Sequence, residues 1–202
     1  MKKFSQILSA LFSPLLVPTY GMALAGFLTI LHLLPLSLIW TAIGITFVIT
    51  CLLPMSAIVS MYRMGFIKDP GLNERTERTV PYMVTVLCYL GCGFFFYKAN
   101  APLWLPMFFA GGALACVINI VVNRWWKISA HAAAMGGLVA LIFRIVASHY
   151  ALYNMNIWLS GVIIVAGLVM TARVYLGRHT LWQVILGFAN GFICVYLLSM
   201  IH

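Results

Sequence analysis

The sequence predicts an all-α fold: a polytopic membrane helical bundle of six to seven transmembrane helices, forming a single integral membrane domain over residues 1–202. Two observations predict this class. Hydrophobic residues make up 64% of the chain and charged residues 7%, whereas charged residues are roughly 25% of an ordinary globular protein. The apolar residues also form runs close to the roughly 20 residues that one helical crossing of a bilayer requires.

Seven apolar runs mark the expected helices in chain order. They cover residues 15–34, 37–60, 81–97, 103–122, 131–148, 157–175 and 180–201. Pro14 and Pro18 interrupt the start of the first run, so six spans with an interfacial N-terminal helix are the alternative. The glycine pairs Gly111–Gly112 and Gly136–Gly137 are expected to let neighbouring helices approach closely.

The breaks between the runs differ in charge. Those after the second, fourth and sixth runs extend from Arg63 to Arg78, from Arg124 to His131 and from Arg173 to His179, and they are rich in charge, whereas the others are nearly bare. Two crossings separate each charged break from the next, so all three lie on one side of the membrane, whether or not the first run spans it. We therefore expect their side chains, within a core of residues 61–202, to meet in one site.

The first charged break contains Lys68, Arg75 and Arg78, together with all the acidic residues of the chain. On a helix, Arg75 and Arg78 would share a face. Arginine suits bidentate contacts to phosphate, so this break predicts part of a phosphate site, with Glu74 or Glu77 holding the basic side chains in place. A solvated loop with local salt bridges is the alternative.

The second charged break places Ser129 and His131 at the start of the fifth run. The backbone N–H groups at a helix N-terminus are unpaired and favour an anion. Ser129 either caps this helix or donates a hydrogen bond to a phosphate oxygen. Lys127, two residues earlier, is a further candidate for the same anion.

The third charged break contains Arg173, His179 and Gln183. His179 and Gln183 are four residues apart, so they share a face of the last helix. Gln183 can accept a hydrogen bond from one imidazole nitrogen and aim the other outward. Polar groups at a membrane boundary are costly unless they have a function, so this stretch indicates an active site.

Two histidines, a serine and several lysines and arginines on one membrane face, without an acidic cluster for a metal, suit phosphoryl transfer through a phosphohistidine. One imidazole attacks phosphorus while guanidinium and ammonium groups neutralise the phosphoryl oxygens. The second imidazole protonates the leaving oxygen and then activates water. We therefore expect a metal-independent hydrolase without a cofactor.

The first break resembles a motif of the membrane phosphatidic acid phosphatase type 2 and vanadium haloperoxidase superfamily. The three motifs of that superfamily read K-x6-R-P, P-S-G-H and S-R-x5-H-x3-D. Lys68 and Arg75 have the spacing of the first motif, with Thr76 in place of its proline. Arg78, in R-T-V-P, is the alternative counterpart of its arginine.

The other two breaks are similar to the second and third motifs. I-S-A-H at residues 128–131 keeps the serine and the histidine of the second. A-R-V-Y-L-G-R-H-T-L-W-Q at residues 172–183 keeps the arginine, the spacing and the histidine of the third, but has Ala172 for its serine and Gln183 for its aspartate. The resemblance covers residues 68 to 183 and implies a membrane phosphatase fold.

The resemblance also implies residue roles. His179 would be the nucleophile, His131 the general acid and Gln183 the orienting partner of His179. The phosphate would be bound by Lys68, Arg75 or Arg78, Ser129 and Arg173, with Lys127 as a further ligand. A neutral amide orients an imidazole but does not stabilise its cation as a carboxylate does, so the alternative is a catalytically degenerate protein that binds or transports a lipid phosphate.

The expected substrate is a lipid phosphate monoester or diphosphate, because the site lies at the bilayer surface between hydrophobic walls. The net charge of +9 lies in short loops between spans, so anionic membrane lipids, not nucleic acid, are the expected partners. All Lys and Arg residues except Lys98 and Arg144 lie on the side of the charged breaks, which favours a cytoplasmic site by the positive-inside rule. We expect the chain in a bacterial inner membrane.

Overall fold

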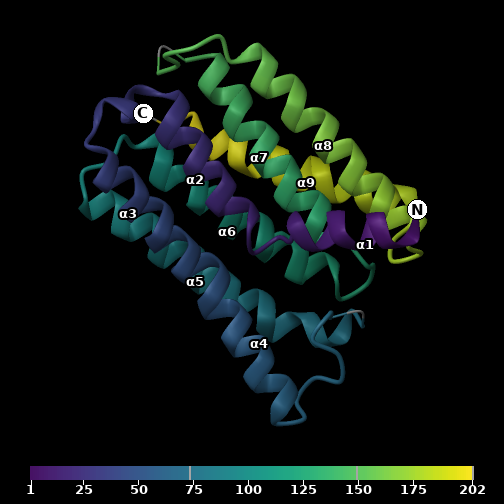
Figure 1. Cartoon of the computed structure of the whole chain (residues 1–202). Coiled ribbons are helices and arrows are strands. Elements are labelled where there is room, and N and C mark those ends of the chain that lie inside the picture. The colour runs from purple at the N-terminus through teal and green to yellow at the C-terminus, as the bar shows by residue number, and fades with distance from the viewer. Residues whose placement is uncertain (73, 149, 202) are drawn as a thin grey trace.

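The computed structural model of the chain describes residues 1–72, 74–148 and 150–201. This part of the chain is helical apart from loops and one isolated β-bridge, between Thr29 and Ala151. In chain order the elements are α1 (Lys2–Leu11), α2 (Val17–Leu28), the 3₁₀ helix η1 (Ile30–Leu33), α3 (Leu36–Phe47), the π-helical segment η2 (Val48–Leu52), α4 (Leu53–Arg63), the 3₁₀ helix η3 (Thr76–Arg78), α5 (Thr79–Lys98), α6 (Trp104–Val122), α7 (Ala130–Val146), α8 (Asn156–Tyr175) and α9 (Leu181–Ser199) (Figure 1).

The predicted membrane bundle is confirmed. Five helices are long and apolar enough to cross a bilayer: Leu36–Arg63, Thr76–Lys98, Trp104–Val122, Asn156–Tyr175 and Leu181–Ser199. The other two predicted runs form the shorter apolar helices α2 and α7. With 17 residues, α7 lies at the lower limit of about 17 residues for a transmembrane helix.

The first predicted run is not one continuous helix. It divides at Thr29, whose backbone is extended (φ −116°, ψ −177°) and whose side chain caps η1 by accepting the N–H of Leu31. Beside this break, Ile30 donates its N–H to the carbonyl of Tyr150, and Leu152 donates to Leu28. The short α2 is therefore completed by contacts with the loop between α7 and α8, at the end of the bundle opposite the charged breaks.

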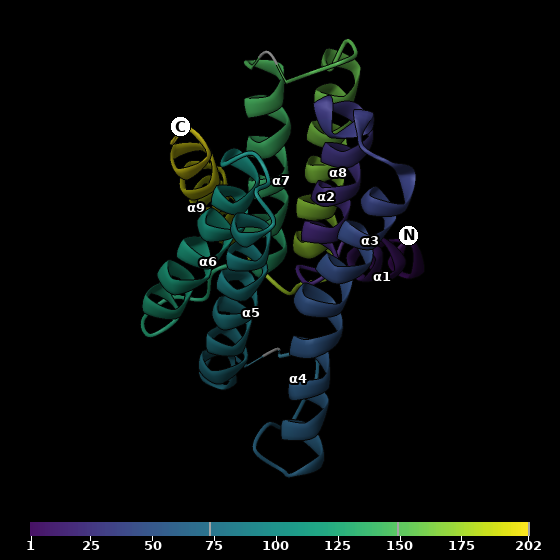
Figure 2. The same ribbon diagram turned by 90° about the vertical axis from the view of Figure 1, so that its left-hand side faces the viewer.

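The second run, Leu36–Arg63, contains a π-helical segment with a clear cause. Pro54 lacks an N–H and its ring would meet the carbonyl four residues earlier. The helix widens just before it, so that the N–H of Leu53 donates to the carbonyl of Val48, five residues back. Beyond this point α4 extends past the end of the neighbouring α5 (Figure 2), and residues of α4 and of the α1–α2 linker line a common cavity.

Glycines allow α9 to pack closely against two neighbours, as predicted from the glycine pairs. A Cβ atom on Gly111 of α6 would lie 2.6 Å from the Cα of Val195. At the crossing of α7 and α9, a Cβ on Gly136 would collide with the carbonyl of Phe188, and one on Gly191 would collide with the carbonyl of Ala133. This close crossing brings together the N-terminal ends of α7, which carries His131, and of α9, which begins two residues after His179.

Candidate active site

A cavity of about 480 Å³ lies where the three charged breaks meet. Residues from every charged break line it: Arg78, His131, Arg173 and His179. The prediction that these breaks share one site is therefore confirmed by the geometry. No acidic side chain is among the described residues that line the cavity.

A helix-terminating turn fixes where Arg173 stands relative to His179. After α8, the N–H of Gly177 donates to Val174 and the N–H of Arg178 donates to the carbonyl of Arg173. This pair of hydrogen bonds is a Schellman ending. It requires a left-handed residue, and Gly177 supplies it with φ +65°. The chain therefore reverses directly after Arg173 and reaches His179 within one tight turn.

Gln183 fixes the tautomer of His179. The Gln183 Oε1 atom lies 3.1 Å from Nδ1 of His179 and 3.2 Å from the backbone nitrogen of Thr180. Because a backbone N–H can only donate, the oxygen of the amide must face this point, and Nδ1 of His179 must therefore carry a proton. Nε2 makes no hydrogen bond within the described residues, so in the neutral imidazole its lone pair is free. The predicted contact between His179 and Gln183 is present, but the two do not share a helix face as expected, because His179 precedes the N-cap Thr180 and lies outside α9.

Gln183 also caps the N-terminus of α9. The hydroxyl of Thr180 accepts the N–H of Gln183, and the Gln183 side chain accepts the N–H of Thr180, which together form a capping box at the start of α9. Capping boxes use Glu or Gln at this position. Gln183, one of the two residues at which the third motif departs from the superfamily pattern, therefore also stabilises the start of α9.

The surroundings of His179 favour its neutral form. Burial lowers the pKa of its imidazole to about 3, and the nearby cations of Arg78 and Arg173 act in the same direction. The hydrogen bond to Gln183 opposes this effect and raises the pKa. A neutral imidazole with a free Nε2 is the form that a nucleophile requires.

Arg78, not Arg75, lies in the cavity. The Arg78 side chain is 6% exposed, and it donates from Nε to the carbonyl of Leu72 (2.8 Å) and from Nη1 to that of Ile128 (3.1 Å). Arg75 instead donates to the carbonyls of Asn123 and Arg124 at the end of α6. The structure thus favours Arg78 as the counterpart of the arginine in the first motif. Arg75 instead joins the loop to α6.

Arg173 is the second cation of the cavity. Its Nη1 donates to the hydroxyl of Ser9 at 2.7 Å, whereas its Nε is buried without a hydrogen-bond partner in the described part of the chain. Neither Arg78 nor Arg173 forms an ion pair with a described acidic side chain. Buried cations without a counter-ion are costly, so the two guanidinium groups favour the binding of an anion.

The other residues predicted to bind phosphate do not line the cavity. Ser129 is fully buried and its hydroxyl accepts the N–H of Ala132, so it caps α7, which was the alternative interpretation. Lys68 is exposed, and its backbone N–H donates to the carboxylate of Glu77. Glu77 therefore holds the loop through the backbone of Lys68, and it pairs with no basic side chain in the described part of the chain.

Lys127 lies just outside the cavity but contributes to its field. Loss of hydration lowers the pKa of its ammonium group, and the charges of Arg78, Arg173 and Arg178 lower it further, while Glu74 raises it. Lys127 therefore shares the electrostatic environment of the two arginines that line the cavity.

Ser9 is a site residue that the sequence interpretation missed. It belongs to α1 and contacts both Arg173 and His131. Ser5 and Ser9 are four residues apart among apolar residues, so they share one face of α1. That spacing was the available signal, but nothing in the sequence showed which helix this face would meet.

The rest of the cavity is apolar. Its deeper lining comes from α5, α6, α7 and α9 and consists mainly of aromatic, aliphatic and small residues. Gly112 lets the ring of Tyr89 pack against α6 in this wall, since a Cβ there would lie 2.8 Å from that ring. On the side of α4, Met55, Ile58 and Val59 complete the wall. A ligand in this site would place its charge between the arginines and its apolar part between the helices.

Comparison with known protein families gives one match. The family model of the PAP2 superfamily matches residues 123–202, which contain the second and third charged breaks. This match confirms the resemblance that those motifs indicate. Searches of curated proteins and of solved structures found no significant match.

Proposed function

We propose that this integral membrane protein, whose residues 123–202 match the PAP2 superfamily, is a lipid phosphatase that acts through a phosphohistidine on His179. One observation carries the proposal. Arg78 and Arg173 line a cavity beside two histidines, without an acidic partner among the described residues. A phosphoryl group would supply the missing negative charge, and the imidazole of His179 has its free nitrogen available for attack.

The proposed reaction has two steps. First, Nε2 of His179 attacks phosphorus and the bond from phosphorus to the lipid oxygen breaks. His131, whose protonated form the bound anion favours, gives its proton to that oxygen. Second, neutral His131 takes a proton from water, the resulting hydroxide attacks the phosphohistidine, and inorganic phosphate leaves as His179 is restored. Arg78 and Arg173 neutralise the phosphoryl oxygens in both steps.

The apolar part of the cavity supports a lipid as the substrate. Ligand sites of roughly 300–1,000 Å³ hold a molecule of drug size, so a cavity of about 480 Å³ can take a phosphate and part of one chain. The remainder of a lipid would extend past α4 into the bilayer. We therefore propose a phosphate monoester or diphosphate of a membrane lipid as the substrate.

The proposal is tested by phosphate release from a panel of lipid phosphates in vesicles, with His179→Ala as the variant. His32→Ala is the matched control, because His32 is exposed on η1, away from the cavity. We expect phosphate release by the wild type and by His32→Ala, and its loss in His179→Ala. Full activity of His179→Ala would exclude the phosphohistidine.

A protein that binds a lipid phosphate without turnover is the second candidate. It is favoured by Gln183, a neutral residue in contact with His179 where the superfamily motif has an aspartate. Such a protein would keep the two arginines and bind orthovanadate, yet it would release no phosphate from any member of the panel. Measuring vanadate binding and phosphate release on the same preparation separates the two candidates.

A further inference from the structure

Ser9 connects two residues of the site from outside the charged breaks. Its side chain is 6% exposed. Its hydroxyl oxygen lies 2.7 Å from Nη1 of Arg173 and 3.3 Å from Nε2 of His131, and its carbonyl oxygen lies 3.0 Å from the same Nε2. Among the described residues, Ser9 alone hydrogen-bonds both side chains.

The carbonyl of Ser9 determines the tautomer of His131. A carbonyl oxygen has no proton to give, so Nε2 of a neutral His131 must carry the proton and donate it to Ser9. Nδ1 is then the nitrogen that remains for a substrate. The arrangement parallels that of His179, where Gln183 holds one nitrogen and leaves the other free.

We propose that Ser9 is a positioning residue of this site: its carbonyl orients His131, and its hydroxyl directs the guanidinium of Arg173 toward the bound anion. The inference depends on the proposed function only in requiring that the cavity binds a phosphoryl-like anion. Ser9 does not react in this account. It acts by fixing the direction of two groups that would.

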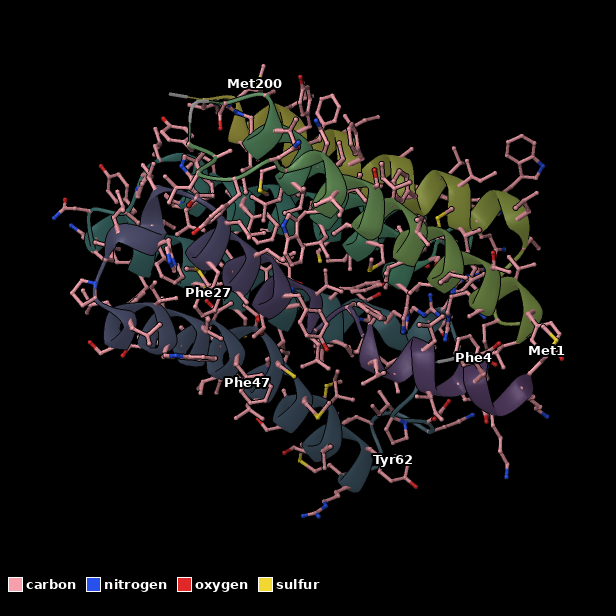
Figure 3. The ribbon with its side chains drawn as sticks, turned by 45° about the horizontal axis from the view of Figure 1, so that its top comes forward. Met1, Phe4, Phe27, Phe47, Tyr62 and Met200 are labelled. Carbon is pink, nitrogen blue, oxygen red and sulfur yellow. The ribbon has the colours of Figure 1, made fainter. Side chains whose placement is uncertain are left out.

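The faces of α1 explain how a residue so near the N-terminus reaches the site. Ser5 and Ser9 are buried against the bundle, whereas Phe4, Ile7 and Leu11 are more than half exposed on another face. A helix with such a face lies in the membrane surface with its apolar side in lipid. Figure 1 shows α1 at the C-terminal end of α8, and Figure 3 shows Phe4 at this end of the molecule. Lipid on the outer face would thus hold Ser9 in place.

The experiment measures the binding of orthovanadate to the full chain in lipid nanodiscs by titration calorimetry. Ser9→Ala removes the hydroxyl, Ser9→Thr restores one, and Ser5→Ala is the matched control, because Ser5 is equally buried on α1 but its side chain has no hydrogen bond to the site. Each serine substitution is made in the wild type and in Arg173→Lys. Thermal unfolding of every variant reports whether it is folded.

In the wild-type background, Ser9→Ala should weaken vanadate binding by about tenfold to a hundredfold, the range expected for a hydrogen bond to a charged group. Ser5→Ala should leave it within about twofold, a change well below that range, and Ser9→Thr should recover most of the loss. In the Arg173→Lys background, Ser9→Ala should have little further effect, because the group that Ser9 positions is gone.

Two results would overturn the inference. Equal effects of Ser9→Ala in both backgrounds would mean that Ser9 supports the fold and does not act through Arg173. Tighter binding in Ser9→Ala would mean that the serine competes with the anion for the guanidinium. Absence of vanadate binding by the wild type would instead contradict the proposed function itself.

Discussion

Gln183→Glu isolates the effect of one negative charge on His179. Glutamate has the length of glutamine, and the capping box accepts either residue, so the contacts to His179 and Thr180 at 3.1 and 3.2 Å can persist. Two unit charges about 4 Å apart interact by about 4 kcal/mol at an effective dielectric constant of 20, which corresponds to about 3 pKa units. A carboxylate stabilises the imidazolium, so the pKa of His179 should rise from about 3 toward its ordinary value.

The assay is the pH dependence of kcat/KM for phosphate release, which reports the ionisation of the free enzyme. The wild type and Gln183→Glu are compared on the same lipid phosphate, so that ionisation of the substrate affects both equally. Activity that requires neutral His179 is lost as pH falls through its pKa, so the acid limb of the variant should lie about 3 pH units above that of the wild type. At neutral pH its turnover should increase, because the carboxylate stabilises the cationic phosphohistidine. An unmoved acid limb, or a lower turnover in a folded variant, would show that a negative charge at position 183 does not stabilise the cationic forms of His179.

Three further predictions concern the arginines and the glycines. Arg78→Gln should reduce kcat/KM by about tenfold to a hundredfold through loss of a charged hydrogen-bond donor, whereas Arg75→Gln, outside the cavity, should change kcat/KM by less than about threefold. Steady-state kinetics measure both variants, and equal losses would contradict the assignment of Arg78 as the arginine that binds phosphate. Gly191→Ala should destabilise the protein by about 1–3 kcal/mol by forcing α7 from α9. Gly161→Ala is the control, because a Cβ there meets nothing within 4 Å, and it should not lower the stability. Thermal unfolding in detergent measures the difference between the two variants. Gly112→Leu should push against the ring of Tyr89, which also lines the apolar part of the cavity, and reduce the space there. KM for a long-chain lipid phosphate should rise by about tenfold or more, the cost of losing one or two buried methylenes. The KM for a short-chain analogue is the control, and an equal rise there would refute a chain site.

The sequence was sufficient to predict that three distant breaks meet. That prediction depended on the number of crossings between Arg78, His131 and Arg173, which the length of the apolar runs determines. It did not depend on the first run, whose division at Thr29 arises from contacts with the α7–α8 loop. Chain length and hydrophobicity indicate where helices cross a membrane, but they do not indicate which loop completes a short one.

The sequence could not identify which arginine of the first break lies in the cavity. Arg75 has the spacing of the superfamily motif, yet Arg78 is the buried residue, because its guanidinium is fixed by the carbonyls of Leu72 and Ile128. Leu72 adopts a left-handed conformation with φ +50°, which a leucine rarely does. Loop geometry of this kind depends on tertiary contacts, so motif spacing alone could not determine it.

The contribution of α1 was also beyond prediction from the sequence. Ser9 lies far along the chain from His131 and Arg173, and serine on a helix is not by itself a functional signal. Only the packing of α1 against α8 places it between those residues. For Ser129, by contrast, the sequence did allow its capping role to be predicted, because it lies directly before a helix.

The measurement that tests the phosphohistidine most directly is chemical trapping of the intermediate. The wild type is mixed with phosphatidic acid labelled with ³²P on phosphorus, or with whichever lipid phosphate of the panel it hydrolyses, and is quenched within milliseconds. We expect a phosphoryl group that is labile to acid and stable to alkali, recovered on the peptide that contains His179 and absent from His179→Ala. Label on a different residue, or hydrolysis by His179→Ala at the wild-type rate, would contradict it.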